Sequence, residues 1–150
     1  MNKTFFAIVL IVAACPLQGV AQKARPSPLS PVQLEKLLKW IETKGSNARL
    51  NEQVIRALGL GDGTMIALRN AGTFDPRTGK RYTFGFMIGA GRYISTMSDG
   101  SSPHVFLLDE NLKVLAGLKT GFGIERMPPS EAEAGARETL EQFSQFIEIN

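Results

Sequence analysis

The sequence predicts an α+β domain with an antiparallel meander sheet of about five strands, two N-terminal helices and one C-terminal helix packed on it. Short alternating apolar runs separated by turn residues fill residues 64–119. Residues 31–58 and the stretch after residue 130 instead place apolar side chains at helical spacing. The 150 residues are 43% hydrophobic and 21% charged, a composition typical of one globular domain.

The first residues have the pattern of an export signal. Lys3 precedes an apolar run, residues 5–14, that is too short to span a bilayer. Gly19, Val20 and Ala21 are the small residues that a signal peptidase reads. We therefore expect a signal peptide over residues 1–21 and a periplasmic or secreted protein.

Cys15 supports a second interpretation of the same segment. Residues 12–15, Val-Ala-Ala-Cys, are similar to the lipobox of bacterial lipoproteins, in which a lipid on the cysteine anchors the chain to a membrane. A retained membrane segment is the third interpretation. Cys15 is the only cysteine, so cleavage after Ala21 leaves no disulfide, thiolate metal ligand or cysteine nucleophile.

Residues 22–30 are rich in proline and serine, which disfavour helix and sheet. We expect a flexible N-terminus there and a single α+β domain over residues 31–150. From residue 22 onward the chain carries 16 basic and 14 acidic residues. This small excess of positive charge does not favour a nucleic-acid partner.

Two helices are predicted at the start of this domain. Ser30 and Gln33 form a capping-box pattern, and the apolar stripe that follows them ends at Gly45. A shorter stripe over residues 50–58 ends at Gly59. We expect the two helices to pack as a helical hairpin.

The predicted strands begin after the second helix. Pro76 and Gly79 are typical of a bulged hairpin turn between a strand that starts at residue 64 and a strand over residues 80–88. The strand 80–88 collects its large apolar residues on one face. These residues are Tyr82, Phe84, Phe86 and Ile88. Residues 92–98 form the next expected strand.

The last two expected strands differ in pattern. Residues 104–109 are apolar on both faces, so this strand should lie near the middle of the sheet and be covered on both sides. Residues 112–119 alternate, which predicts a single inward face made of Leu112, Val114, Ala116 and Leu118. A Gly- and Pro-rich loop then leads to the last helix, which should begin at Ser130.

This order of elements is similar to that of profilin-like and PAS-like sheets, and a cone-shaped fold with an interior pocket also fits it. The likeness is one of architecture without shared motifs, so it implies no function.

No motif for catalysis, metal binding or nucleotide binding stands out. His104 is the only histidine, and a hydrolase with His104 as general base for a nearby serine ranks last among the functions considered. The sequence has no Gly-x-Ser-x-Gly elbow. One histidine and no mature cysteine argue against a zinc site, and we expect no cofactor.

Two surfaces are candidates for binding. Arg77, Lys80 and Arg81 form a basic group at the first hairpin tip, with Arg92 as an additional candidate. Phe122 lies between two glycines in a loop, where an aromatic side chain can act as a contact or lid.

We therefore expect a non-enzymatic exported binding protein that acts on another envelope or secreted protein, as an inhibitor or immunity-like partner. The alternative is a binding or sensor module for a small apolar ligand. That alternative places a pocket between a helix and the aromatic face of Phe84 and Phe86, gated by Phe122.

Overall fold

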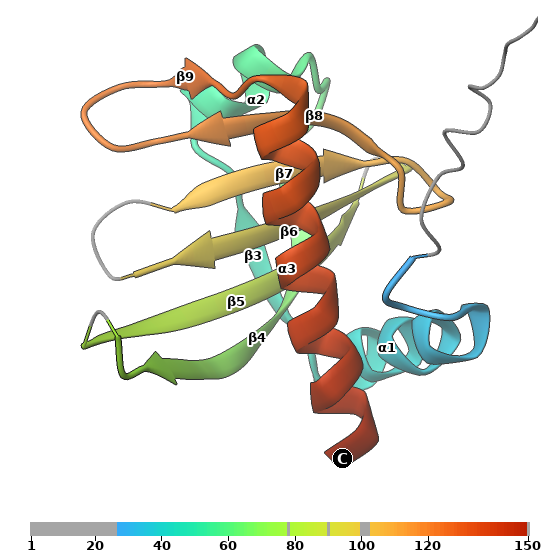
Figure 1. The fold of residues 1–150 in the computed structure, drawn as a ribbon. Helices are drawn as coiled ribbons and strands as arrows, with labels where there is room; N and C mark the ends of the chain where they lie inside the picture. Colours follow the sequence, from blue (N-terminus) through green and yellow to red (C-terminus); the bar gives the residue numbers. More distant parts are fainter. Residues whose placement is uncertain (1–26, 78, 90, 100–102, 150) are drawn as a thin grey trace, which may run out of the picture.

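The computed structural model describes residues 27–77, 79–89, 91–99 and 103–149 (Figure 1). Within them, seven antiparallel strands form one open sheet in the order β3-β4-β5-β6-β7-β8-β9, accompanied by three helices. The elements in chain order are α1 (Pro31–Lys44), β3 (Ser46–Arg49), α2 (Glu52–Leu58), β4 (Thr64–Asp75), β5 (Lys80–Gly89), β6 (Arg92–Ser98), β7 (His104–Leu108), β8 (Val114–Lys119), β9 (Glu125–Arg126) and α3 (Pro129–Ile149). The predicted signal peptide, Cys15 and most of the predicted flexible N-terminus lie outside the described residues.

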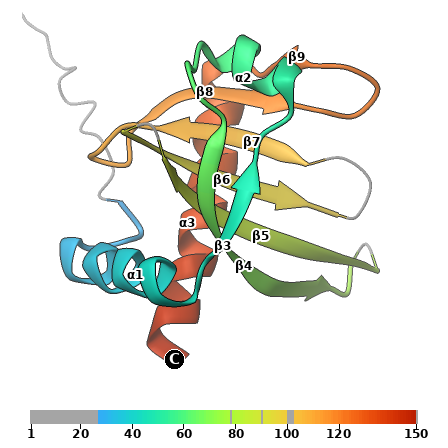
Figure 2. The same cartoon turned by 180° about the vertical axis from the view of Figure 1, so that it is seen from behind.

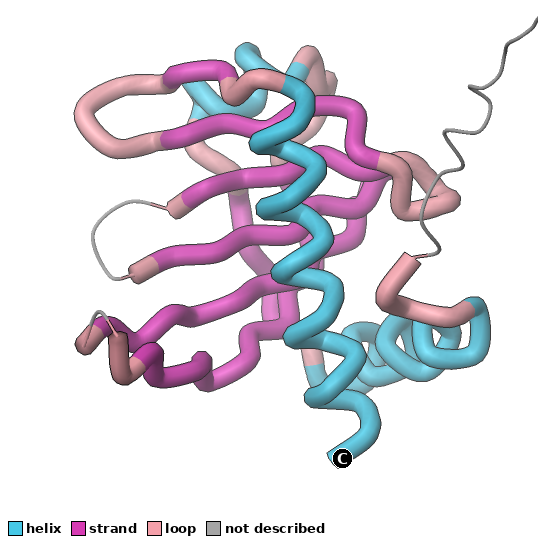
Figure 3. The backbone as a smooth tube through the Cα atoms, in the orientation of Figure 1, coloured by secondary structure: helices cyan, strands magenta, loops and turns pink. Residues whose placement is uncertain are grey.

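The helices lie on both faces of the sheet. α3 crosses one face, with α1 beside its C-terminal half (Figure 1). β3 and the start of β4 fold over the opposite face, where α2 also lies (Figure 2). Arg126 Nη2 donates a 2.8 Å hydrogen bond to the carbonyl oxygen of Ala57, which ties β9 to α2. The sheet is therefore curled, and α2 bridges its two ends (Figure 3).

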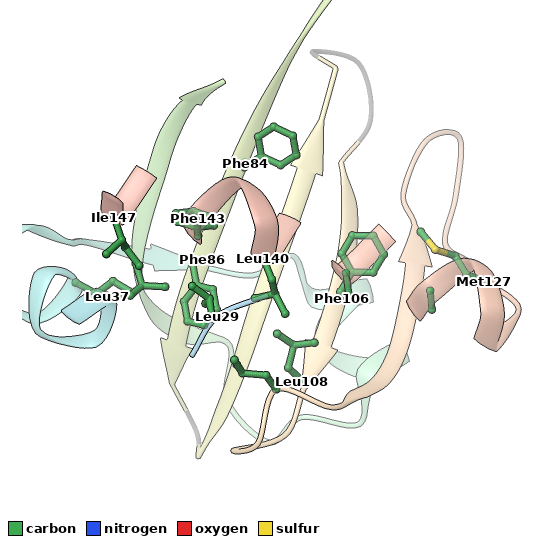
Figure 4. Packing of buried hydrophobic residues seen from close by; sticks show 14 residues of the cluster. Leu29, Leu37, Phe84, Phe86, Phe106, Leu108, Met127, Leu140, Phe143 and Ile147 are labelled. Atoms are coloured by element: carbon green, nitrogen blue, oxygen red, sulfur yellow. The ribbon is translucent and has the colours of Figure 1, made fainter. Parts of the chain in front are cut away.

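The larger core lies between α3 and the sheet. Phe86 on β5 and Phe143 on α3 meet edge to face, with ring centroids 5.8 Å apart. Figure 4 shows Phe84, Phe86 and Phe106 of the sheet gathered with Leu140 and Phe143 of α3. Tyr82 and Ile88 are partly buried against the same cluster, which confirms the predicted aromatic face of β5.

A second core lies on the opposite face, beneath α2. Val54 and Leu58 of α2 close over apolar side chains from the strands. Those strand residues are Met65, Ala67, Met87, Ile94, Val105, Leu107 and Leu118. β7 supplies Phe106 and Leu108 to the first core and Val105 and Leu107 to the second. This confirms that β7 is an inner strand covered on both sides.

The predictions of about five strands and of a helical hairpin are wrong. Residues 46–49 form β3, which pairs with β4 from Ser46 opposite Ala67 to Arg49 opposite Thr64. β3 is short, polar and largely exposed, so it has no apolar alternation to reveal it, and its pairing with β4 defines it. β3 separates α1 from α2, which lie on opposite faces of the sheet (Figures 1 and 2). β9 was likewise hidden in a predicted loop.

The predicted single inward face of β8 is also wrong, because the strand carries a bulge. Val114 and Ala116 pair with consecutive residues of β7, so Leu115 is the extra residue and is 48% exposed. A bulge reverses the faces that follow it. Leu112 and Val114 therefore join the core under α3, whereas Ala116 and Leu118 join the core under α2.

The structure confirms the capping box and the first hairpin turn that the sequence predicts, and it moves the start of the last helix by one residue. Ser30 and Gln33 form the predicted capping box, with Gln33 N donating to Ser30 Oγ at 3.2 Å and Ser30 N donating to Gln33 Oε1 at 3.0 Å. Gly79 has φ of 70° at the first hairpin, a left-handed conformation that glycine adopts without strain. α3 begins one residue earlier than predicted, at Pro129, which suits a first helical position.

α3 packs tightly against the sheet at Gly135. A Cβ atom on Gly135 would lie 2.5 Å from Cζ of Phe106, whose side chain is fully buried and cannot turn aside. One turn further along, Thr139 Oγ1 lies 2.9 Å from Ser95 Oγ and 2.7 Å from the carbonyl oxygen of Ala136. The two buried hydroxyl groups therefore satisfy each other at the helix–sheet contact.

We expect Gly135→Ala to destabilise the protein. In an open helix this substitution stabilises by about 1 kcal/mol, but crowding a packed core usually costs about 1–3 kcal/mol. Urea unfolding measures the net change in the free energy of unfolding. Phe106→Leu removes the crowding ring atoms, so the double variant should lose less stability than the sum of the two single losses. A Gly135→Ala protein more stable than the wild type would contradict this packing.

Candidate functional site

A cavity of about 680 Å³ lies on the face of the sheet opposite α3. β4 to β7 form its floor, the start of α2 and the residues before it form its roof, and the loop between β8 and β9 forms one wall. The described lining residues are Arg49, Leu50, Asn51, Gln53, Val54, Arg69, Thr83, Phe84, Gly85, Met87, Thr96, Ser98, Pro103, Val105, Thr120, Gly121, Phe122, Gly123 and Ile124. The volume is in the usual range for sites that hold a small molecule.

Strand pairing arranges part of the floor as a row across the sheet. In order, the paired residues are Arg69, Gly85, Thr96, Val105 and Leu118. Neighbouring strands lie about 4.8 Å apart, so the four steps span roughly 19 Å along the curved sheet. The row has a charged end on β4, a polar middle and an apolar end on β7 and β8.

The polar part of the cavity floor, on β5 and β6, lies beside the second core and not within it. The parallel row one pleat away, which includes Met87, lies beneath Val54 and Leu58 in the second core. Beyond it the sheet presents small and hydroxylated residues, namely Thr83, Gly85, Thr96 and Ser98. These side chains can face water or a ligand without exposing a large apolar area.

Phe122 lies at the wall of the cavity and its side chain is fully exposed. Gly121 and Gly123 flank it, and a Cβ atom on Gly123 would meet nothing within 4 Å. The cavity therefore lies beside the predicted gate. It is on the opposite face of β5 from the aromatic face where the sequence placed it, because Phe84 and Phe86 are packed beneath α3.

Two arginines line the cavity, and their surroundings differ. Arg49 Nη2 lies 3.0 Å from Glu52 Oε2, and Arg49 Nη1 lies 3.8 Å from Asp62 Oδ1, so two carboxylates balance its charge. Arg69 takes part in none of the ion pairs or side-chain hydrogen bonds found among the described residues. No described lining residue is acidic.

The predicted basic group is only partly assembled. Arg77, Lys80 and Arg81 lie together at the hairpin between β4 and β5, with all three exposed. Lys80 Nζ lies 3.0 Å from Asp99 Oδ2, and this hydrogen bond raises the pKa of Lys80. Arg92 pairs with Gly89 at the other end of β5, so the structure does not bring it to the hairpin tip.

The described residues do not bring a serine and a carboxylate together around His104. The imidazole of His104 is half-buried at the start of β7 and takes part in no side-chain hydrogen bond or ion pair found there. Ser95 is fully buried and hydrogen-bonded to Thr139. Ser98 lies on the face of the sheet that lines the cavity, opposite the face that carries His104 and Met97. Positions 101 and 102, the other serines near His104 in the sequence, lie outside the described residues.

Two structural features are absent from the described part of the chain. No group of three or more His, Cys, Asp or Glu side chains is placed to hold a metal ion there. No helix there has both the length and the apolar character needed to cross a membrane.

The sequence did not identify Arg69, Thr83 or Thr96 as site residues. Alternation along residues 80–88 did separate the face of Thr83 and Gly85 from the aromatic face. It could not show that Thr83 and Gly85 line a cavity, because α2 and the loop before β9, which also line it, come from distant parts of the chain. Arg69 becomes a site residue only through its pairing opposite Gly85.

We expect the Asp62 carboxyl group to titrate below its usual pKa of 3.8. The backbone N–H of Thr64 donates to Asp62 Oδ1 at 3.1 Å, and the charge of Arg49 adds to this effect. The resulting stabilisation is present above the unfolded-state pKa and is lost as the pH falls through the lower folded-state pKa. NMR titration of the carboxyl carbon measures it. Arg49→Gln should raise the pKa of Asp62, whereas Arg92→Gln should not, and an unshifted pKa would contradict the pairing.

Comparisons with protein-family models, with curated proteins and with solved structures found no significant match to this chain. The function must therefore be inferred from the fold and the cavity alone.

Proposed function

We propose that this is an exported, non-enzymatic binding protein that holds a small, mainly apolar ligand in the cavity above β4 to β7. The observation that carries the proposal is the cavity itself, with its volume of about 680 Å³. Ligand sites typically combine a largely apolar lining with a few polar groups that orient the ligand. Export rests on the signal-peptide pattern of residues 1–21.

The roof and the apolar part of the floor supply the apolar contacts that such a ligand needs. Val54 of α2, Met87 of β5 and Val105 of β7 belong to the second core and also line the cavity. An apolar ligand would extend this core outward over the uncovered floor. Burial of its surface would contribute about 25 cal/mol per Å² of apolar area.

The floor is suited to hold a ligand without rearrangement. Gly85 and Thr96 lie on inner strands of the sheet and are each paired on both sides, and Thr83 is paired with Ser98 of β6, so the ladder fixes their backbone. A preformed site avoids the entropy cost of ordering a loop when the ligand binds. The flanking glycines leave Phe122 as the part of the wall that can adjust to cover the ligand.

We expect Thr83→Trp to reduce ligand binding by filling the cavity. Thr83 is exposed on the floor, so the larger side chain can be accommodated without disturbing either core. Nile red, a neutral apolar dye, serves as the probe, and fluorescence titration should show an affinity loss of about tenfold or more. Leu115→Trp, at an exposed position of β8 that does not line the cavity, is the matched control and should bind as the wild type does. Equal binding by both variants would contradict the proposal.

A second candidate function is recognition of an acidic envelope or secreted protein by the hairpin tip. Arg77 and Arg81 are exposed there, at the end of two long strands that project them from the body of the domain (Figure 1). Clustered basic side chains favour an acidic partner and speed its association.

We expect the double variant Arg77→Glu and Arg81→Glu to lose any salt-sensitive capture of an acidic protein from an envelope extract. The charge reversal replaces attraction by repulsion at the tip. Arg92→Glu makes the same change of charge at the opposite end of β5 and should keep the capture. Capture that is unchanged in the double variant, or lost equally in the control, would remove the hairpin tip as the binding surface.

A further inference from the structure

We propose that the ligand of the cavity is an amphiphile with an anionic head group, with the head bound by Arg69 and the apolar chain directed toward Val105 and Ile124. This inference rests on the proposed function and specifies the chemical class of the ligand. Three features of the described residues support it: the charge of Arg69, the change in polarity along the floor, and the hydroxyl group of Thr96 over Gly85.

The charge of Arg69 is the first feature. Its guanidinium group lines the cavity and takes part in no ion pair or side-chain hydrogen bond among the described residues. The other lining arginine, Arg49, already faces Glu52 and Asp62. The described lining contains no carboxylate, so the cavity presents one unbalanced positive charge to whatever enters it.

The direction of the floor is the second feature. Moving from β4 toward β8, the paired row passes from Arg69 through Thr96 to Val105, and Ile124 lines the wall beyond. The site is therefore cationic at one end, hydroxylated in the middle and apolar at the other. A ligand that matches this order has an anionic group at one end and an apolar chain at the other.

Gly85 provides the third feature, a position without a side chain that the hydroxyl group of Thr96 overlies. It is the residue paired directly with Arg69, and a Cβ atom there would lie 2.5 Å from Thr96 Oγ1. The missing side chain at Gly85 thus leaves room for the Thr96 hydroxyl group, which lies over the residue paired with Arg69 and can donate a hydrogen bond to an anionic head group.

The guanidinium group is well matched to such a head group. Its planar set of N–H donors can bind two oxygens of a carboxylate, phosphate or sulfate at once. Arg69 is exposed, so water and salt screen part of its charge, and the apolar chain must supply the rest of the affinity. The shared chemistry is therefore an anionic oxygen head group joined to an apolar chain.

The test compares decanoate with decanol, which share the chain and differ in the charge of the head. Calorimetric titration measures affinity, and amide NMR of the protein locates the site. We expect decanoate to bind more tightly than decanol and to shift the amide signals of Gly85, Thr96 and Val105. Arg69→Gln should weaken decanoate binding by about tenfold, because one charge-assisted interaction is lost, and should change decanol binding by less than about twofold.

Two controls separate the head-group contact from general charge effects. Arg92→Gln removes one positive charge far from the cavity and should leave both affinities unchanged. Arg69→Lys keeps the charge without the planar pair of donors and should retain part of the preference for decanoate. Inorganic phosphate alone should bind at least about a hundredfold more weakly than decanoate, because it lacks the chain.

The failure of this inference is distinguishable from the failure of the proposed function. Equal affinities for decanoate and decanol at the cavity, both unaffected by Arg69→Gln, would overturn the anionic head group and leave the apolar site standing. If neither compound shifts the cavity signals, the cavity is not a site for amphiphiles, and both proposals fail. Phosphate binding as tight as that of decanoate would overturn the requirement for a chain.

Discussion

The structure depends on the need to cover both faces of its central strands. β7 carries Phe106 and Leu108 on one side and Val105 and Leu107 on the other, so neither face can be left to water. α3 covers the first face along its whole length, helped by close approach at Gly135. Among the described helices, only α2, of seven residues, lies on the second face, so the curled sheet brings Ala48 of β3, with Leu50 and Ile124, to complete that core.

The cavity follows from this unequal cover. The second core beneath α2 includes Met87 of β5 and Ile94 of β6 but not the positions beyond them, where Thr83, Gly85 and Thr96 stand in place of large apolar residues. An uncovered apolar row at this position would expose a patch prone to association. The polar floor therefore keeps the uncovered part of the sheet soluble, and Val54, Met87 and Val105 leave an apolar rim for a ligand.

Local patterns in the sequence predicted the parts of the fold that depend on nearby residues. The capping box of Ser30, the hairpin turn at Gly79 and the two-sided burial of residues 104–109 are all signals within a few residues. β3 could not be predicted in this way, because its four residues become a strand only by pairing with β4. The bulge at Leu115 was hidden for a related reason, since alternation along one strand does not show how the partner strand aligns with it.

The residues of the candidate site could not be identified from the sequence for the same reason, because strand pairing decides which residues lie together. The basic residues selected from the sequence were neighbours along the chain, yet Arg92 lies at the far end of β5 from Arg77 and Arg81. The arginine that lines the cavity, Arg69, has no sequence signal of its own and gains its place from its pairing with Gly85. A binding site on a curled sheet is assembled by register across strands. The row from Arg69 to Val105 therefore determines the chemistry of the site. This row is charged at one end and apolar at the other, as an amphiphile is.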